Sequence, residues 1–325
     1  MADPIPSEII VTDQPSDLDR QDAVALAQQA EAEDGHAAVN EAGLFALQQP
    51  SPGSPGQSRT EAKSIRTGHA LARDPNSGDL VGYGQVRWEN GTPVAALVVH
   101  PGHRRQGLGS RLWRALSALA GEQSSVPLQI WASGDGPAAR TLAAKEGLRA
   151  VRTLLVLSRS LAGSLPPAEP PDGTAIRAFR PGVDDAAWLA VNARAFADHP
   201  EQGSVTSADL AQRMAEPWFD PDGFFLAVKA TGEETAEQVL GFHWTKREPG
   251  ADVGEVYVIG VDPQAGIRGL GTPLLGAGLA YLRDRGATEV ELYVESDNER
   301  ALNLYHRHGF ARTSADVMYA VVGPG

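Results

Sequence analysis

The 325-residue sequence predicts an α/β protein built from two tandem copies of one domain, each a mixed, mostly antiparallel sheet flanked by helices. Three observations lead to this prediction. A strand pattern, a glycine loop and an amphipathic helix follow one another twice along the chain. The two occurrences keep one register, and a Pro-rich segment separates them. A chain of this length is also ordinary for two domains.

The repeat holds at a shift of 162 residues. This shift places Gly107 on Gly269 and stays in register, without a gap, as far as Gly147 and Gly309. Isolated glycine matches would not keep one register over such a length. The two halves are therefore interpreted as copies of one supersecondary unit.

The middle of the chain, LAGSLPPAEPPDG at 161–173, is rich in proline and is predicted to be a linker. It separates a first domain, 1–160, from a second domain, 174–325. Another segment, QQPSPGSPGQSRT at 48–60, has almost nothing to bury and is predicted to be a mobile surface loop.

Both halves show the same order of elements. Those expected in the first half are a helix over 15–47, strands over 68–74, 79–88 and 92–99, a helix entered from the glycine loop, a strand over 127–132, a helix over 137–146 and a strand over 148–158. Those expected in the second half are a strand over 174–179, helices over 184–197 and 206–215, strands over 223–229, 238–246 and 253–261, a helix after the glycine loop, a strand over 288–295, a helix over 298–308 and a last strand through Val322. An antiparallel meander followed by strand, helix, strand, helix, strand is typical of a mixed α/β sheet.

The stretch EVYVIGVDPQAGIRGLGTP, which begins at Glu255, is the one around which the second half is organised. Alternation predicts a strand with Glu255, Tyr257 and Ile259 on one face. Gly260, near the end of this strand, indicates a bulge or a close backbone approach. Asp262, which precedes a proline, ends the strand.

A glycine loop from Gly266 to Gly271 leads from this strand into a helix. Thr272 is a candidate cap for the helix, and Pro273 suits its first turn. Bare N–H groups and the positive end of a helix dipole bind phosphate when they point at one place. The pattern therefore favours a phosphate-bearing cofactor, although ordinary tight turns have the same spacing.

Composition limits the classes of partner. The net charge of −13 argues against nucleic acid, because phosphate contacts need a basic face. It is compatible with an amine substrate, and solubility explains it equally well. The absence of cysteine excludes disulfides and a thiol nucleophile. We find no signal-peptide pattern and no apolar run that could span a bilayer, so we expect a cytoplasmic protein without a membrane partner.

Two motifs carry a resemblance to a known superfamily. RRQGLG at 104–109 fits the Q/R-x-x-G-x-G/A acetyl-CoA loop of the GCN5-related N-acetyltransferases. NERALNLYHRHGF at 298–310 resembles the N-x-x-A-x-x-L-Y-x-x-x-G-F signature of the same superfamily. GFHWTKREPGADVGEVYVIGVDP and AFADHPEQG resemble the mycothiol synthases, a family with two such domains in tandem.

The resemblance implies a reaction, a cosubstrate and a small-molecule substrate. It implies transfer of acetyl from acetyl-CoA to the cysteinyl amine of cysteinyl-glucosaminyl-inositol, the last step of mycothiol biosynthesis. Two alternatives stay open: acetylation of another amine, such as a protein N-terminus, and a non-catalytic acetyl-CoA sensor. His306 and His308 are two apart on a predicted helix and face different ways, so we expect no metal site. We also expect a monomer.

The second glycine loop departs from the superfamily pattern. Gly266 stands where the superfamily carries Gln or Arg, and Ile267 stands where mycothiol synthases commonly have Gly or Arg. One side-chain contact to the pyrophosphate is therefore lost, and Arg268 could replace part of it. Since the first loop keeps Arg104, we expect the first loop to bind CoA more tightly than the second.

Acetyl transfer to an amine needs a base, an oxyanion donor and an acid for the leaving thiolate. The resemblance makes Glu255 the general base and Tyr305 the acid. A strand carboxylate is otherwise often only solvated, and a helix tyrosine is usually a core residue. The residues that the resemblance assigns to substrate binding are Glu41, Glu201, Lys246, Glu255 and Tyr293.

Acetyl-CoA is expected to lie along the end of the strand, the glycine loop and the start of the following helix. Backbone N–H groups at 259–261 would hold the pantetheine and polarise the thioester carbonyl. The residues expected to contact the cosubstrate in the second copy are Ile259, Gly260, Val261, Gly266, Ile267, Arg268, Gly269, Leu270, Gly271, Thr272, Asn298, Glu299, Arg300, Ala301, Leu302 and Asn303.

The first copy is expected to be catalytically silent. The repeat register places Glu255 on Pro93 and Tyr305 on Ala143, so this copy lacks both proton-transfer groups. It is expected to contribute Glu41 to the substrate site and to keep a CoA-binding segment. The residues expected to contact CoA in that segment are Leu97, Val98, Val99, Arg104, Arg105, Gln106, Gly107, Leu108 and Gly109.

Overall fold

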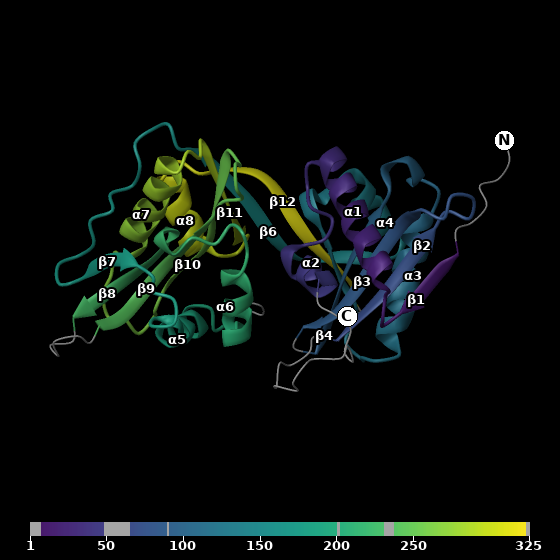
Figure 1. Cartoon of the computed structure of the whole chain (residues 1–325), viewed down its shortest axis with the longest axis horizontal. Helices are drawn as coiled ribbons and strands as arrows, with labels where there is room; N and C mark the ends of the chain where they lie inside the picture. The colour runs from purple at the N-terminus through teal and green to yellow at the C-terminus, as the bar shows by residue number, and fades with distance from the viewer. Residues whose placement is uncertain (1–7, 49–65, 90, 200–201, 231–236, 323–325) are drawn as a thin grey trace. The chain divides into compact units, whose positions relative to one another are not determined.

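The structure is a computed structural model that divides into two compact units, which Figure 1 shows. The N-terminal unit comprises Met1–Thr153 with Ala315–Gly325, and the C-terminal unit comprises Leu154–Ser314. The residues that the structure describes are 8–48, 66–89, 91–199, 202–230 and 237–322. Apart from Gln48, the surface loop predicted at 48–60 lies outside the described residues.

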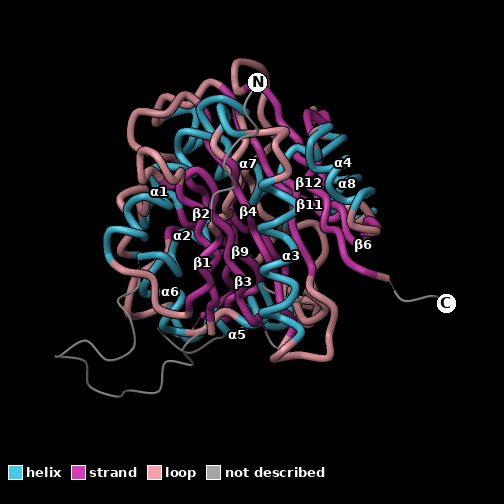
Figure 2. The backbone as a smooth tube through the Cα atoms, turned by 90° about the vertical axis from the view of Figure 1, so that its right-hand side faces the viewer, coloured by secondary structure: helices cyan, strands magenta, loops and turns pink. Residues whose placement is uncertain are grey.

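The N-terminal unit is a sheet with helices on both faces. Its elements are β1 (Ile9–Thr12), α1 (Asp17–Asp34), α2 (Glu41–Gln48), β2 (Thr67–Arg73), β3 (Leu80–Glu89), β4 (Thr92–Val99), α3 (Leu108–Gly121), β5 (Gln129–Ala132) and α4 (Pro137–Lys145). The strands lie in the order β1-β2-β3-β4-β5-β12, and only the β4–β5 pair is parallel. Figure 2 shows α1 and α3 on opposite sides of β2 and β3. Each of the two helices covers its own apolar cluster.

The single helix predicted over 15–47 is wrong, because the chain turns at Gly35. α1 begins at a capping box, in which Ser16 and Asp19 bond each other's backbone N–H. It ends where Gly35 adopts a left-handed conformation with φ 71°, which a glycine reaches without strain. α2 is therefore a separate helix, and β1, which precedes α1, was not predicted.

The C-terminal unit repeats the same plan. Its elements are the second part of β6 (Leu148–Ser160), β7 (Ala175–Ala178), α5 (Asp185–Ala195), α6 (Ser207–Met214), β8 (Phe224–Ala230), β9 (Glu237–Lys246), β10 (Val253–Val261), α7 (Gly271–Asp284), β11 (Glu289–Glu295), α8 (Glu299–Arg307) and the start of β12 (Ala311–Val321). The strands lie in the order β6-β11-β10-β9-β8-β7, and only the β10–β11 pair is parallel. The predicted mixed, mostly antiparallel sheet is confirmed in both units.

The last strands of the two copies are exchanged. In β6, Leu154 to Ser160 pair with β11 of the C-terminal unit, whereas in β12, Val317 to Ala320 pair with β5 of the N-terminal unit. The compact units consequently differ from the predicted ranges 1–160 and 174–325. The repeat register marks where each strand lies in the sequence, and it carries no information on which copy the strand pairs with.

Apolar clusters cover both faces of the C-terminal sheet. On one face, α5 and α6 cover an aromatic cluster centred on Trp188, Phe224 and Trp244. On the other face, α7 and α8 cover a mainly aliphatic cluster that includes Leu279 and Leu292. We call these the aromatic face and the aliphatic face.

The segment predicted as a linker packs on the aliphatic face. Leu161 is buried in the aliphatic cluster, and Leu165 packs against it. A side chain at Gly276 of α7 would meet the carbonyl oxygens of Pro166 and Pro167, so the glycine allows this segment to lie directly on the helix. We call residues 161–173 the strap.

Candidate active site

The candidate site is built on β10, whose register changes once. β10 pairs with β9 with a shift between Val256 and Val258, so Tyr257 is the extra residue of a β-bulge. Beyond the bulge Gly260 pairs regularly with Phe242. The bulge predicted near Gly260 is therefore wrong in position. The space beside Gly260 is nevertheless tight, because a Cβ there would lie 3.0 Å from the Phe242 ring, which is a side chain rather than another backbone.

The bulge also changes which side chains share a face. Val256 and Ile259 pack in the aliphatic cluster, whereas Tyr257 packs in the aromatic one. The prediction that Glu255, Tyr257 and Ile259 share one face is thus wrong for Ile259. One extra residue reverses the alternation that follows it.

β10 and β11 separate directly after Glu255. Their parallel pairing covers only Val253 to Glu255, while β10 remains paired with β9 as far as Val261. Among the described residues, the later part of this edge of β10 has no strand partner. Its backbone polar groups are available to an extended ligand, because a bound chain can complete an open sheet edge.

Glu255 occupies the centre of a polar row across three strands. It pairs with Lys246 of β9 on one side and with Glu291 of β11 on the other. Val290, Leu292 and Val294 are buried in the aliphatic cluster, so alternation turns Glu291 and Tyr293 to the aromatic face. Tyr293 is 47% exposed there. Of the predicted substrate-binding residues, the structure brings together Lys246, Glu255 and Tyr293 on one face.

Aromatic rings hold Lys246 in place. Its Nζ lies 5.1 Å from the centre of the Trp218 ring and 5.7 Å from the centre of the Tyr257 ring, within range of cation–π attraction. The Tyr257 hydroxyl accepts a hydrogen bond from Arg213 Nε at 2.9 Å. Glu291, Arg213 and Trp218 were missed by sequence reasoning. Strand alternation relative to Tyr293 could have found Glu291, whereas no local pattern marks Trp218.

A loop after α5 adds a histidine to this face. His199 Nδ1 accepts the Gln202 N–H at 3.1 Å, so the ring proton is on Nε2, which lies 3.9 Å from Glu295 Oε1. Glu201 lies outside the described residues. Glu41 is the first residue of α2 in the N-terminal unit, and its side chain is not described.

The glycine loop after β10 presents bare backbone donors. Among the described residues, the N–H groups from Gly266 to Thr272 have no hydrogen-bond acceptor. α7 begins at Gly271 with Leu270 as its N-cap and no side-chain cap, so the prediction that Thr272 caps it is wrong. Pro273 does lie in the first turn. Uncapped N–H groups at a helix start are the donors that a phosphate needs.

Backbone geometry explains the glycine at the first position of this loop. Gly266 has φ 67° and Gly269 has φ 88°, both in the left-handed region that favours glycine. The loop is also anchored at its start, where buried Asp262 accepts from Arg194 Nη2 at 2.6 Å. This hydrogen bond lowers the pKa of Asp262 and keeps it ionised. The segment that leads into the loop is thus fixed by the Asp262–Arg194 ion pair, and the left-handed conformation at position 266 favours glycine over arginine.

α8 supplies the remaining predicted residues. Asn298 caps it by accepting the Ala301 N–H at 3.1 Å, and Glu299, Arg300 and Asn303 are exposed, with Leu302 partly buried. Tyr305 is buried in the aliphatic cluster, with its ring centre 5.6 Å from that of Phe310. Burial raises the pKa of the Tyr305 phenol, which therefore stays protonated at neutral pH.

The N-terminal loop has the same kind of backbone donors, but its arginine, Arg104, forms an ion pair within the chain. The N–H groups from Arg105 to Gly109 have no acceptor among the described residues. Both Nη atoms of Arg104 bond the Asp34 carboxylate at 2.7 Å, and its Nε donates to the Val99 carbonyl. These contacts raise the pKa of Arg104. Arg104, which we expected to strengthen CoA binding at this loop, is thus already paired with Asp34.

Leu97, Val98 and Val99 line the end of β4, which pairs with β5 only at Val94 and Ala95. In this unit too, therefore, the parallel strands separate next to a glycine loop. The residues at the register positions of Glu255 and Tyr305, Pro93 and Ala143, are buried and carry no titratable group.

Two features that would suggest other chemistry are not found. In the part of the chain that the structure describes, no cluster of His, Asp and Glu side chains could hold a metal ion. No helix within the same ranges is long and apolar enough to cross a membrane.

Comparison with known proteins agrees with this geometry. The Acetyltransferase (GNAT) family model matches residues 43–147 and 188–310, one match in each copy. A mycothiol acetyltransferase of Catenulispora acidiphila is 46% identical over 318 residues, which cover 95% of this chain and 97% of that protein. The chain belongs to the mycothiol acetyltransferase family. It is a GNAT enzyme, an acetyl-CoA-dependent N-acetyltransferase with two tandem domains.

A second mycothiol acetyltransferase supports the assignment, and two solved structures share the fold. The mycothiol acetyltransferase of Salinispora tropica is 52% identical and is covered over 81% of its length, with 78% of this chain. A solved GCN5-related N-acetyltransferase from Sphaerobacter thermophilus shares the fold, with a TM-score of 0.67, 24% identity and coverage of 99% of this chain and 98% of that one. A tandem GNAT protein from the clavulanic acid pathway shares it at a TM-score of 0.67 and 19% identity, covering 98% of this chain and 99% of that protein.

Proposed function

We propose that the C-terminal unit transfers acetyl from acetyl-CoA to the cysteinyl amine of cysteinyl-glucosaminyl-inositol. The observation that carries this proposal is the position of Glu255. It is the last paired residue before β10 and β11 separate, and the open edge of β10 leads from it to the bare N–H groups of the glycine loop. The Glu255 carboxylate therefore lies at one end of the open β10 edge, and the glycine loop lies at the other end. This arrangement suits an extended thioester that carries phosphate groups.

The reaction follows from this arrangement. The amine nitrogen attacks the thioester carbonyl carbon, and Glu255 accepts the proton that the nitrogen loses, directly or through a water. Backbone N–H groups at the open end of β10 stabilise the negative charge on the carbonyl oxygen. The carbon–sulfur bond then breaks, and the protonated Tyr305 phenol supplies a proton to the departing CoA thiolate. The products are an amide and CoA.

Substrate recognition is assigned to the aromatic face. Lys246, Glu255 and Tyr293 are charged or hydroxyl-bearing groups on that face, which suits a ligand rich in hydroxyl groups. Glu41 and Glu201 are proposed to add further contacts. The N-terminal copy is proposed to be silent, since Pro93 and Ala143 cannot move a proton.

The proposal is tested by the reaction of the full chain with acetyl-CoA and a panel of amines. We expect acetylation of cysteinyl-glucosaminyl-inositol, seen as one added acetyl group in the product mass spectrum. Preference for peptides with free N-termini would favour the protein-acetylating alternative, and no turnover with any amine would favour a sensor.

The role of Glu255 is tested separately. Glu255→Gln should lower kcat/KM for the amine by about 10²–10⁴ near neutral pH, because the amide cannot accept the proton. Acetyl-CoA binding measured by calorimetry should be unchanged. A variant with nearly wild-type turnover would remove Glu255 from the mechanism.

A further inference from the structure

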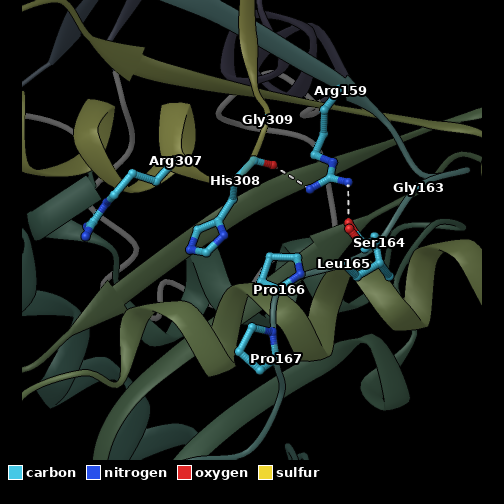
Figure 3. Close-up of a pocket in the computed structure, with 9 residues that line it drawn as sticks. All are labelled: Arg159, Gly163, Ser164, Leu165, Pro166, Pro167, Arg307, His308 and Gly309. Atoms are coloured by element: carbon cyan, nitrogen blue, oxygen red, sulfur yellow. Dashed lines mark hydrogen bonds between the residues drawn. The ribbon is translucent and has the colours of Figure 1, made fainter.

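A basic pocket lies in the C-terminal unit, between the start of the strap and the end of α8 (Figure 3). Its volume is ≈ 430 Å³, and the charged or titratable side chains that line it are Arg159, Arg307 and His308. No carboxylate is among its lining residues. In a chain with a net charge of −13, a cavity lined only by basic titratable groups is suited to an anion.

Arg159 fixes the walls of this pocket. Its guanidinium donates to the carbonyl oxygens of Ser164 and His308, as the dashed lines in Figure 3 show. It also lies 6.0 Å from the centre of the Phe310 ring. These contacts join the strap to the end of α8, so the pocket is a built feature of the fold. The N–H groups of Arg159 donate to backbone carbonyl oxygens, which are neutral, so the positive charge of its guanidinium at the pocket is not neutralised by these contacts.

Arg307 adds a positive charge to the pocket, and no described carboxylate pairs with it. Its Nε donates to the Asn303 carbonyl at 2.9 Å, and it forms no ion pair with any described residue. The side chain is exposed and extends away from Arg159 in Figure 3. Arg300 lies seven positions earlier, on the same exposed face of α8, and it too lacks an ion pair within the described ranges.

The pocket adjoins the start of α7. His308 Nε2 lies 3.3 Å from the Thr272 hydroxyl, and Thr272 is the last of the residues whose backbone N–H groups lack an acceptor. The strap reaches the same loop, because a Cβ at Gly269 would lie 3.9 Å from Pro171. A ligand whose pyrophosphate sits on the loop would therefore extend its next group into the pocket.

In CoA, the group next to the pyrophosphate is a ribose that carries a 3′-phosphate. We propose that this pocket binds the 3′-phosphate of acetyl-CoA, with Arg307 as its charged ligand. The proposal rests on acetyl-CoA as the cosubstrate in the proposed function and is independent of which amine is acetylated. A phosphate monoester has close to two negative charges at neutral pH, which an arginine with open Nη donors matches.

His308 does not supply the charge. Burial, together with the charges of Arg307 and Arg159, lowers the pKa of His308 below its usual value of 6.5. Its ring is therefore neutral at neutral pH and can contribute only a hydrogen bond. This leaves Arg307 as the side chain to test.

The test is titration calorimetry of the full chain with CoA and with 3′-dephospho-CoA, which lacks only the proposed ligand group. We expect the wild type to bind CoA about tenfold more tightly, since a charge-assisted hydrogen bond of this kind contributes on that scale. Arg307→Gln should weaken CoA binding by about the same factor and leave binding of 3′-dephospho-CoA unchanged.

Arg283→Gln is the matched control. Arg283 is an arginine near the far end of α7 with a side chain that is 47% exposed and paired with Asp284. This variant should bind both ligands as the wild type does. Equal wild-type affinity for the two ligands, or an equal loss for both in Arg307→Gln, would overturn the proposal. No amine is present, so the result does not depend on the substrate assignment.

A further titration, with inorganic phosphate, tells whether the pocket binds the 3′-phosphate of CoA or free phosphate. Inorganic phosphate is titrated against the wild type and Arg307→Gln. Should phosphate bind through Arg307 while CoA and 3′-dephospho-CoA bind equally well, the pocket would be a site for free phosphate and the proposal would be wrong.

Discussion

At the scale of single residues, His243 shows how closely the core of the C-terminal unit is fitted. Its ring is fully buried under α7, and Nδ1 donates to the Leu274 carbonyl at 2.8 Å. Nε2 has no hydrogen-bond partner among the described residues. Gly278 makes room for the ring, because a Cβ there would overlap it. The first turns of α7, which follow the glycine loop, thus pack directly on the His243 ring through Leu274 and Gly278.

Gly278→Ala should therefore lower the free energy of unfolding by about 2 kcal/mol, as expected when a tight core is overfilled. In His243→Ala/Gly278→Ala the ring is gone, so the added methyl group should cost much less than it does alone. Urea denaturation of the four chains measures this coupling. Gly121→Ala in α3 is the control, because a Cβ there meets nothing within 4 Å. Additive losses would show that the two residues do not interact in this way.

The same histidine predicts a pH dependence of stability. Burial lowers the pKa of His243 to about 4, while the unfolded chain keeps the usual value of 6.5. Between these values the unfolded state binds more protons, so the free energy of unfolding falls as pH drops from 6.5 towards 4. From pH 7.5 to pH 5 we expect a loss of about 2 kcal/mol from this residue. His243→Gln, which keeps a donor for Leu274, should remove that part of the loss in urea titrations at the two pH values.

At the scale of elements, the two glycine loops differ in what their side chains do. Both loops have a left-handed glycine and backbone N–H groups without an acceptor among the described residues, but the N-terminal loop also has an arginine that is tied to α1. The expectation that Arg104 makes the N-terminal loop the tighter CoA site considered the loop alone. The carboxylate that pairs with Arg104 lies seventy positions earlier in the chain, at Asp34.

Asp34→Asn should release Arg104 and raise the CoA affinity of the N-terminal copy by about threefold, the scale of one partly exposed ion pair. Calorimetry of the full chain would resolve this as a change in one of two sites. Asp22→Asn is the control, since Asp22 pairs with Arg73 elsewhere on α1 at 2.8 Å. If both variants bind CoA like the wild type, the ion pair does not compete with the ligand.

At the scale of the whole molecule, the exchange of the last strands makes the two compact units differ from the two halves of the repeat. The range 174–325 omits the β6 residues that pair with β11 and keeps the β12 residues that pair with β5. It thus has one unpaired edge and one strand without a partner. The range 154–314 has neither defect.

The fragment 154–314 should therefore unfold cooperatively on heating, whereas the fragment 174–325 should melt at a lower temperature or without a cooperative transition. Unpaired backbone groups and exposed apolar side chains at the β11 edge are the physical cause. Circular dichroism at 222 nm would follow both transitions. A higher melting temperature for 174–325 would contradict the division of the molecule into these two units.

The sequence by itself determined the features that depend on local pattern. Apolar alternation located nearly every strand, the glycine loops marked the starts of α3 and α7, and the shift of 162 residues revealed the two copies. The motifs indicated acetyl-CoA and the acetyltransferase family. These features repeat within a few residues, where backbone sterics and side-chain spacing suffice to predict them.

Only the tertiary structure decided the features that join distant residues. The bulge at Tyr257 turns Ile259 to the other face, and its position depends on pairing with β9. The partners of Arg104, His243 and Glu255 lie on other elements, as do the strands that complete each sheet. Such contacts form when segments far apart in the chain pack together, and a pattern read along one segment carries no record of its neighbours in space.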